Sequence, residues 1–213
     1  MILVLARHGN TFRPDESAYY VGSQNDLPLV EKGLAQAQQM GQALSGQADN
    51  LVAVYTGPLQ RMQATAKYAL AAMDCPLQPV IDTRLNELDY GLWSGLTSQE
   101  VREKFGDEDY EEWERQSLWP AQGAWGESEP EVIARIQAFA ADLAQRYTAK
   151  DKVLVVASNG CLRYFLHLVP HAFEQKMTQG QLKIATGHLC QLQYDAGAWS
   201  VEYWNQSPND IAS

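Results

Sequence analysis

Short apolar runs alternate with amphipathic stretches through most of the chain. Residues 2–6, 51–55 and 153–157 are almost continuously apolar, as is typical of strands buried on both faces of a parallel sheet. Residues 79–82 form a shorter strand candidate. Several segments between these runs place apolar residues three or four positions apart, which is the spacing of a helix with one buried face. The pattern therefore predicts that strands and helices alternate along the chain.

Proline, glycine and a capping pattern mark the helix boundaries. Pro58 is typical of a first helical turn, and Gly46 of the end of a helix. Ser128 and Glu131 have the spacing of a capping box, in which each residue satisfies a backbone donor of the first turn. We expect helices over residues 31–45, 58–73, 128–147 and 161–169.

The end of the chain has the pattern of a β-hairpin. Residues 188–194 and 199–204 resemble strands, and Asp195-Ala196-Gly197 joins them. With the preceding alternation, this predicts an α/β fold, a three-layer α/β/α sandwich with a mostly parallel central sheet. In such sheets ligands bind at the carboxyl ends of the strands. We expect one domain over residues 1–206 and a loose tail over residues 207–213.

Composition narrows the class of protein. Apolar residues make up 46% of the chain and charged residues 20%, which is ordinary for a globular domain. The net charge of −10 would repel a nucleic-acid backbone, but a few converging arginines still allow an anionic small molecule to bind. Three cysteines without close pairing favour a reducing cytoplasm, and no apolar run is long enough to span a membrane. We therefore expect a soluble cytoplasmic protein that binds neither nucleic acid nor membrane.

The first candidate chemistry follows the first strand directly. Arg7-His8-Gly9 would place a guanidinium and an imidazole on a turn at the sheet edge, where glycine allows the backbone to approach closely. This arrangement suits an anion, although the same triplet alone is also compatible with a solvated turn carrying a structural arginine and histidine.

Further motifs follow in an order that resembles the histidine phosphatase superfamily, and its phosphoglycerate mutase-like branch in particular. The similarity extends from Ile2 to about Arg163 and into the final hairpin. The motifs after the first triplet are residues 26–33, Thr56-Gly57-Pro58-Leu59-Gln60-Arg61, Leu85-Asn86-Glu87-Leu88-Asp89-Tyr90-Gly91, Gly126-Glu127-Ser128 and Ser158-Asn159-Gly160-Cys161-Leu162-Arg163.

The resemblance implies a nucleophilic histidine that forms a phosphohistidine, which water then hydrolyses. His8 matches this nucleophile, and nearby arginines would disfavour its protonated form. Arg7 and Arg61 match the family's phosphate clamps, whose forked donors suit the phosphoryl oxygens. Glu87 matches the family's proton donor to the leaving oxygen, although a lone glutamate in a loop is ordinarily only a solvated charge.

Other residues near the first motif are further candidates. Asn10 and Thr11 are expected to hydrogen-bond the phosphate or orient the turn, and Arg13 is a further possible clamp. Pro14 stands where mutase-like members usually have asparagine, which favours a phosphatase over a mutase.

Asn159 departs from the resemblance, because the family carries its second catalytic histidine at this position. Asparagine donates a hydrogen bond but carries no charge, so we expect turnover reduced roughly 100- to 1000-fold rather than abolished. His188, at the start of the hairpin, is either a structural residue or a partial replacement.

Residues 95–130 interrupt the α/β pattern, and we interpret them as an insertion over the active site. The segment is acidic, and its residues Trp113, Trp119 and Trp125 are expected to pack together. Alternatively, they form a lid that selects the non-phosphate part of the substrate.

The sequence thus predicts a phosphatase that hydrolyses a small phosphomonoester through His8. The alternatives are a catalytically weakened protein that binds a phosphorylated ligand, and a phosphoglycerate-type mutase. We expect no cofactor and no metal, since Pro170 separates His167 from His171 and no metal-binding motif accompanies them. The substrate and the oligomeric state stay open at this stage.

Overall fold

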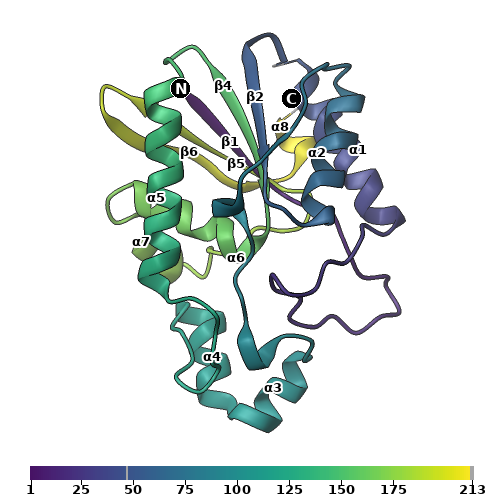
Figure 1. Cartoon of the computed structure of the whole chain (residues 1–213), viewed down its shortest axis with the longest axis vertical. Helices are drawn as coiled ribbons and strands as arrows, with labels where there is room; N and C mark the ends of the chain where they lie inside the picture. Colours follow the sequence, from purple (N-terminus) through teal and green to yellow (C-terminus); the bar gives the residue numbers. More distant parts are fainter. Residues whose placement is uncertain (47, 212–213) are drawn as a thin grey trace.

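A six-stranded sheet forms the centre of the molecule (Figure 1). The computed structural model describes residues 1–46 and 48–211. The strands are β1 (Ile2–Arg7), β2 (Leu51–Thr56), β3 (Val80–Ile81), β4 (Lys152–Ala157), β5 (Leu189–Asp195) and β6 (Ala198–Gln206). Their order is β3-β2-β4-β1-β5-β6; the first four strands in chain order are parallel, and β5 and β6 add an antiparallel edge. The predicted mostly parallel α/β sheet and the closing hairpin are therefore confirmed.

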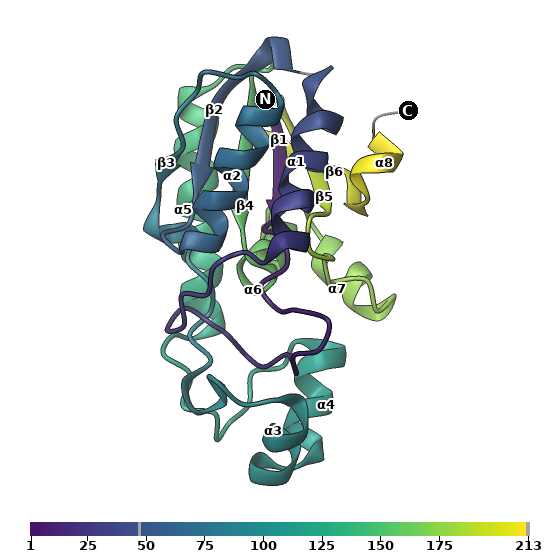
Figure 2. The same cartoon turned by 90° about the vertical axis from the view of Figure 1, so that its right-hand side faces the viewer.

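Helices cover both faces of this sheet (Figure 2). They are α1 (Glu31–Ser45), α2 (Gln60–Ala72), α3 (Ser98–Phe105), α4 (Asp107–Gln116), α5 (Glu129–Arg146), α6 (Asn159–Leu162), α7 (Ala172–Thr178) and α8 (Pro208–Ile211). In β1, Val4 packs in one core with Met40 of α1, whereas Leu3 packs in the other core with Phe139 of α5. Successive strand residues thus bury opposite faces, which explains why the strand segments are continuously apolar.

The helix boundaries agree with the sequence prediction except around two prolines. The helix expected to open at Pro58 begins at Gln60, because Leu59 is still extended. The helix expected over residues 161–169 begins at Asn159, is α-helical only to Leu162 and continues as a 3₁₀-helix over Arg163–Leu168. Val169 is extended, as the steric demands of the following Pro170 favour.

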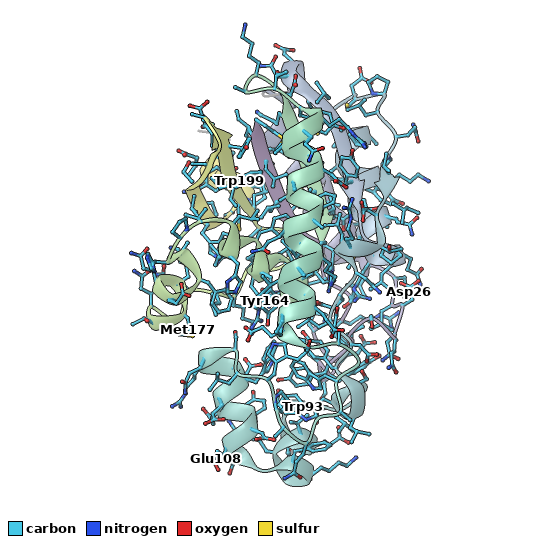
Figure 3. The ribbon with its side chains drawn as sticks, turned by 60° about the vertical axis from the view of Figure 1, so that its left-hand side comes forward. Asp26, Trp93, Glu108, Tyr164, Met177 and Trp199 are labelled. Carbon is cyan, nitrogen blue, oxygen red and sulfur yellow. The ribbon has the colours of Figure 1, made fainter. Side chains whose placement is uncertain are left out.

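The insertion lies beyond the carboxyl ends of the strands (Figure 1), and its buried residues Val101 and Trp113 extend the core that β1 and α5 share. It contains α3 and α4, and its tryptophans pack edge to face, with ring centres 4.6 Å apart for Trp113 and Trp125 and 4.7 Å apart for Trp119 and Trp125. Trp93, which precedes the insertion, packs against Trp125 at 5.5 Å. Figure 3 shows Trp93 among the side chains of this lower part of the molecule. The tryptophan packing expected for the insertion is present.

The C-terminal segment differs from the loose tail that the sequence predicted. Residues 208–211 form α8, which packs against α1 and buries Pro208. The remaining residues of the predicted tail, 212 and 213, lie outside the described part of the chain. Along the described residues, we find no helix with the length and apolarity needed to cross a bilayer.

Candidate active site

The carboxyl ends of the parallel strands surround a cavity of about 490 Å³. Residues from the turn after β1, the start of α2, the loop after β3 and the start of α6 meet here. All seven residues that the sequence analysis assigned to the site line this cavity, namely Arg7, His8, Asn10, Thr11, Arg61, Glu87 and Asn159. The topology explains their convergence, because parallel strands end at the same edge of the sheet.

The imidazole of His8 is held in one tautomer. Its Nδ1 lies 2.7 Å from the carbonyl oxygen of Gly9, which can only accept, so Nδ1 carries the proton. Its Nε2 therefore keeps a lone pair, and the Nε–H of Arg61 donates to it at 3.3 Å. Burial lowers the pKa of His8 well below its ordinary value, and the charges of Arg61 and Arg7 lower it further. His8 thus presents a neutral, nucleophilic Nε2 to the cavity.

Close packing against α1 fixes the turn that carries His8. A Cβ atom added to Gly9 would lie 2.7 Å from the Cα atom of Gly33, so no other residue fits there without moving the backbone. The backbone N–H of Gly9 donates to the hydroxyl of Thr65 at 3.1 Å, which ties the turn to α2 as well.

Two arginines flank His8, and the protein holds each of them through backbone carbonyls. Arg61 is 1% exposed and donates at 2.9 Å to the carbonyl oxygens of Gly22 and Asn25. Arg7 donates through Nη1 to the carbonyl of Ile184, and its buried Nε has no partner among the described residues. Burial lowers the pKa of both guanidinium groups, but arginine stays charged in proteins. Both charges are thus held beside the lone pair of His8.

Glu87 enters the same cavity from the loop after β3. One carboxylate oxygen accepts the backbone N–H groups of Leu88 at 2.9 Å and Cys161 at 3.0 Å, and the other accepts that of Gly160 at 3.3 Å. A Cβ atom added to Gly160 would collide with this carboxylate and lie 2.8 Å from the Tyr90 hydroxyl oxygen. The glycine after Asn159 is therefore required for the position of Glu87.

Asn159 is oriented by the loop before β5. Its Oδ1 accepts a hydrogen bond from the backbone N–H of Ile184 at 2.8 Å. The carbonyl oxygen of Ile184 in turn accepts a hydrogen bond from Arg7. Because the amide oxygen is engaged, the NH₂ group is the donor that Asn159 can offer to a ligand in the cavity.

The remaining candidates divide into residues inside and outside the cavity. Asn10 accepts the hydroxyl of Thr186 through Oδ1, and Thr11 lies on the same wall. Arg13 is exposed and does not line the cavity. His188 does not line it either. Its Nδ1 lies 3.1 Å from the carbonyl oxygen of Asn205 on β6. This position favours the structural interpretation of His188.

The sequence analysis did not single out several other residues of the cavity wall. Tyr90, Arg163 and Thr186 also line it. Trp113, which the sequence analysis named as part of an aromatic cluster or a lid, lines it as well. Burial, and then the charge of Glu87, raise the pKa of Tyr90 well above its ordinary value, so its hydroxyl stays protonated. Tyr90 and Arg163 stand inside the recognised motifs, but no sequence signal marked the loop that carries Thr186.

A metal site made only of protein ligands finds no support in the described side chains. Within residues 1–46 and 48–211, no three histidine, cysteine or carboxylate side chains gather closely enough to hold an ion.

Comparison with known sequences extends over nearly the whole chain. The Histidine phosphatase superfamily (branch 1) matches residues 3–207. The 2,3-bisphosphoglycerate-dependent phosphoglycerate mutase of Methylorubrum populi is 33% identical over 188 residues, which cover 87% of this chain and 86% of the relative.

Two solved structures are similar over the same extent. The alpha-ribazole phosphatase of Shigella flexneri is 25% identical with a TM-score of 0.73, and the alignment covers 97% of each chain. The native mycobacterial glucosyl-3-phosphoglycerate phosphatase is 25% identical with a TM-score of 0.81, covering 97% of this chain and 99% of that one. These similarities confirm the fold predicted from the motifs.

Proposed function

Because this chain belongs to the histidine phosphatase superfamily (branch 1), we propose that it hydrolyses a small phosphomonoester through a phosphohistidine on His8. The observation that carries the proposal is the unprotonated Nε2 of His8, which faces the Arg61 guanidinium inside a cavity. A neutral imidazole beside two fixed positive charges suits attack on a phosphorus atom whose oxygens are anionic.

In the first step, Nε2 of His8 attacks the phosphorus and the bond between phosphorus and the leaving oxygen breaks. Arg7 and Arg61 hold the equatorial oxygens, on which the transition state spreads its charge. Glu87, in its protonated form, gives its proton to the leaving oxygen, so the alcohol departs uncharged. The product of this step is phosphohistidine.

In the second step, water attacks the phosphorus and the bond to Nε2 breaks. The Glu87 carboxylate takes a proton from the water, which regenerates its acid form and releases inorganic phosphate. His8 returns to the neutral tautomer that the Gly9 carbonyl favours. The free cysteines Cys75, Cys161 and Cys190 fit the reducing cytoplasm in which we place this reaction.

Hydrolysis is preferred here to phosphate transfer within one sugar acid. Relatives of this chain are named as mutases and structural neighbours as phosphatases, so family membership alone allows both. Pro14, where mutase-like members usually have asparagine, favours the phosphatase. The alternative of a catalytically weakened protein that binds a phosphorylated ligand gains no support from these relatives, since their names describe enzymes.

Labelled phosphoglycerate separates the two reactions. We expect ³²P from 3-phosphoglycerate to appear in inorganic phosphate, with no label at the 2-position, because water is the final acceptor in the proposed mechanism. Chromatography of the products measures the partition. Label moving to the 2-position without phosphate release would instead assign the chain to the mutases, and label left in place would direct the same assay to other phosphomonoesters.

Asn159 is proposed to limit turnover, since a neutral amide stabilises the transferring phosphoryl group less than an imidazolium does. We expect Asn159→His to raise kcat for 4-nitrophenyl phosphate about 100-fold at pH 6, because the imidazolium gives the phosphoryl group the charged donor that asparagine lacks. Asn159→Ala, which removes the donor, should lower kcat by about 100-fold. Unchanged steady-state rates in both variants would show that Asn159 takes no part in the transfer.

A further inference from the structure

A third buried arginine lines the active-site cavity and has no task in the proposed mechanism. Arg163 begins the 3₁₀-helix after α6 and is 8% exposed. Its Nη1 donates to the hydroxyl of Ser117 at 2.8 Å, and its guanidinium carbon lies 4.7 Å from the ring centre of Trp113. Its Nε is buried without a hydrogen-bond partner among the described residues. A buried N–H group without an acceptor is costly, so this donor is suited to an acceptor from a ligand.

The charges around the cavity leave Arg163 without an anionic partner in the structure as described. Arg115 and Lys183 also line the cavity, but both are exposed, and Arg115 pairs with Glu111 at 2.9 Å. Glu114, also on the wall, accepts the hydroxyl of Tyr20 at 2.9 Å. No ion pair within 4.0 Å joins Arg163 to a carboxylate of the described chain, and a buried charge of this kind is destabilising until an anion binds to it.

Arg163 lines the same cavity as His8 and is in contact with the insertion. Its contacts are with Ser117 and Trp113, whereas His8 contacts Arg61 and the Gly9 backbone. In Figure 3, Tyr164, the next residue, lies between the sheet and α4, and its hydroxyl accepts the indole N–H of Trp119 at 2.8 Å. Arg163 thus connects the insertion to the cavity that contains His8.

We propose that Arg163 forms a second anion subsite, which binds an oxyanion carried by the leaving group of the substrate. This inference rests on the proposed hydrolysis at His8 and specifies its substrate class as phosphomonoesters with a further carboxylate or phosphate. A guanidinium presents two parallel donors to either oxyanion, which gives orientation as well as affinity.

The insertion positions this arginine. Ser117 follows the last residue of α4 and has a left-handed backbone with φ of 55°, which turns the chain there. Its side chain is buried against Arg163, and Trp113, one turn earlier on α4, supports the guanidinium face. The insertion thus acts on substrate choice through Arg163 rather than only through its aromatic surface.

Matched substrates test the subsite. We expect Arg163→Met to weaken kcat/KM for 3-carboxyphenyl phosphate by about 10- to 100-fold, the equivalent of one or two charge-assisted hydrogen bonds, and to change that for phenyl phosphate less than about threefold. A third substrate, 1,3-phenylene bisphosphate, distinguishes a preference for phosphate from one for carboxylate. Arg163→Lys keeps the charge and should recover part of the loss. Unchanged activity on phenyl phosphate also reports that the variant is folded.

Arg115→Met provides the control, because Arg115 is an exposed cation on the same cavity wall. The subsite proposal is wrong if Arg115→Met, and not Arg163→Met, removes the preference for substrates that carry a second oxyanion. It is equally wrong if all three substrates lose the same factor in Arg163→Met.

Measurements of ligand binding distinguish a failure of the anion subsite from a failure of the proposed hydrolysis. Calorimetry with the same three ligands and the His8→Ala protein, with and without Arg163→Met, measures the subsite without turnover. Should the unaltered protein hydrolyse none of them, the proposed function fails for these substrates, while a 10- to 100-fold difference in binding still supports the anion subsite. Equal binding of ligands with and without the second oxyanion to the His8→Ala protein would exclude the subsite.

Discussion

His8→Ala is expected to lower kcat/KM for 4-nitrophenyl phosphate by about 10⁴-fold or more, because removing a nucleophile leaves only the binding and electrostatic parts of catalysis. The variant should also fail to form an acid-labile, base-stable phosphoenzyme when it is quenched after mixing with ³²P-labelled substrate. Continuous release of 4-nitrophenolate measures the rate, and filter binding of the quenched protein measures the intermediate.

The matched control for this variant is His188→Ala. His188 lies outside the cavity and contacts the backbone of β6, so we expect its loss to change kcat/KM less than about threefold. Phosphoenzyme formed by the His8→Ala protein would show that another residue is the nucleophile.

Glu87→Gln is expected to have an effect that depends on the leaving group. An amide cannot supply a proton, so turnover of an alkyl ester such as glycerol 3-phosphate should fall by about 10²- to 10⁴-fold, the usual contribution of general acid catalysis. 4-Nitrophenolate is a weakly basic leaving group that departs without a proton, so its release in the first turnover should fall less than about tenfold. Stopped-flow absorbance measures that first turnover, and a phosphate assay measures the alkyl ester.

The second step provides an independent check on Glu87. Without a carboxylate to take a proton from water, the phosphohistidine should accumulate in Glu87→Gln and appear as a burst of 4-nitrophenolate. Glu127→Gln is the control, because that carboxylate pairs with Arg135 at 3.0 Å and does not line the active-site cavity. Equal losses for alkyl and aryl esters would assign Glu87 a purely structural role.

Local patterns were sufficient to predict most of the elements of the fold. Helix α1 has the bounds that its apolar spacing predicts, and the capping box of α5 is present, with the backbone N–H of Ser128 donating to Glu131 at 2.7 Å. Predictions were less accurate where a boundary depends on a neighbour in space. Residues 208–211 have little local signal, and their helix packs against α1 and buries Pro208.

In the candidate site, too, some residues could be placed from local patterns, whereas others depend on neighbours in space. Arg7 ends β1, His8 follows it, and Arg61 lies in the first turn of the helix after β2. Parallel topology alone therefore places these residues at one edge of the sheet. The sequence identified Arg163 only as the last residue of a motif and predicted no role for it. The role proposed above depends on its contacts with Ser117 and Trp113, which lie about 50 residues away in the chain.

By itself, the sequence determined the class of fold, the order of its elements and the family, because these depend on the periodicity of apolar residues and on short motifs within single segments. Only the tertiary structure decided the tautomer of His8, the engagement of the Asn159 amide oxygen by Ile184 and the burial of Arg163. The contacts of Asn159 and Arg163 depend on which donor or acceptor a distant segment brings within about 3 Å. The tautomer of His8 depends on the turn that α1 holds in place, since this turn brings the carbonyl of the adjacent Gly9 to 2.7 Å. Burial makes each of these contacts energetically decisive.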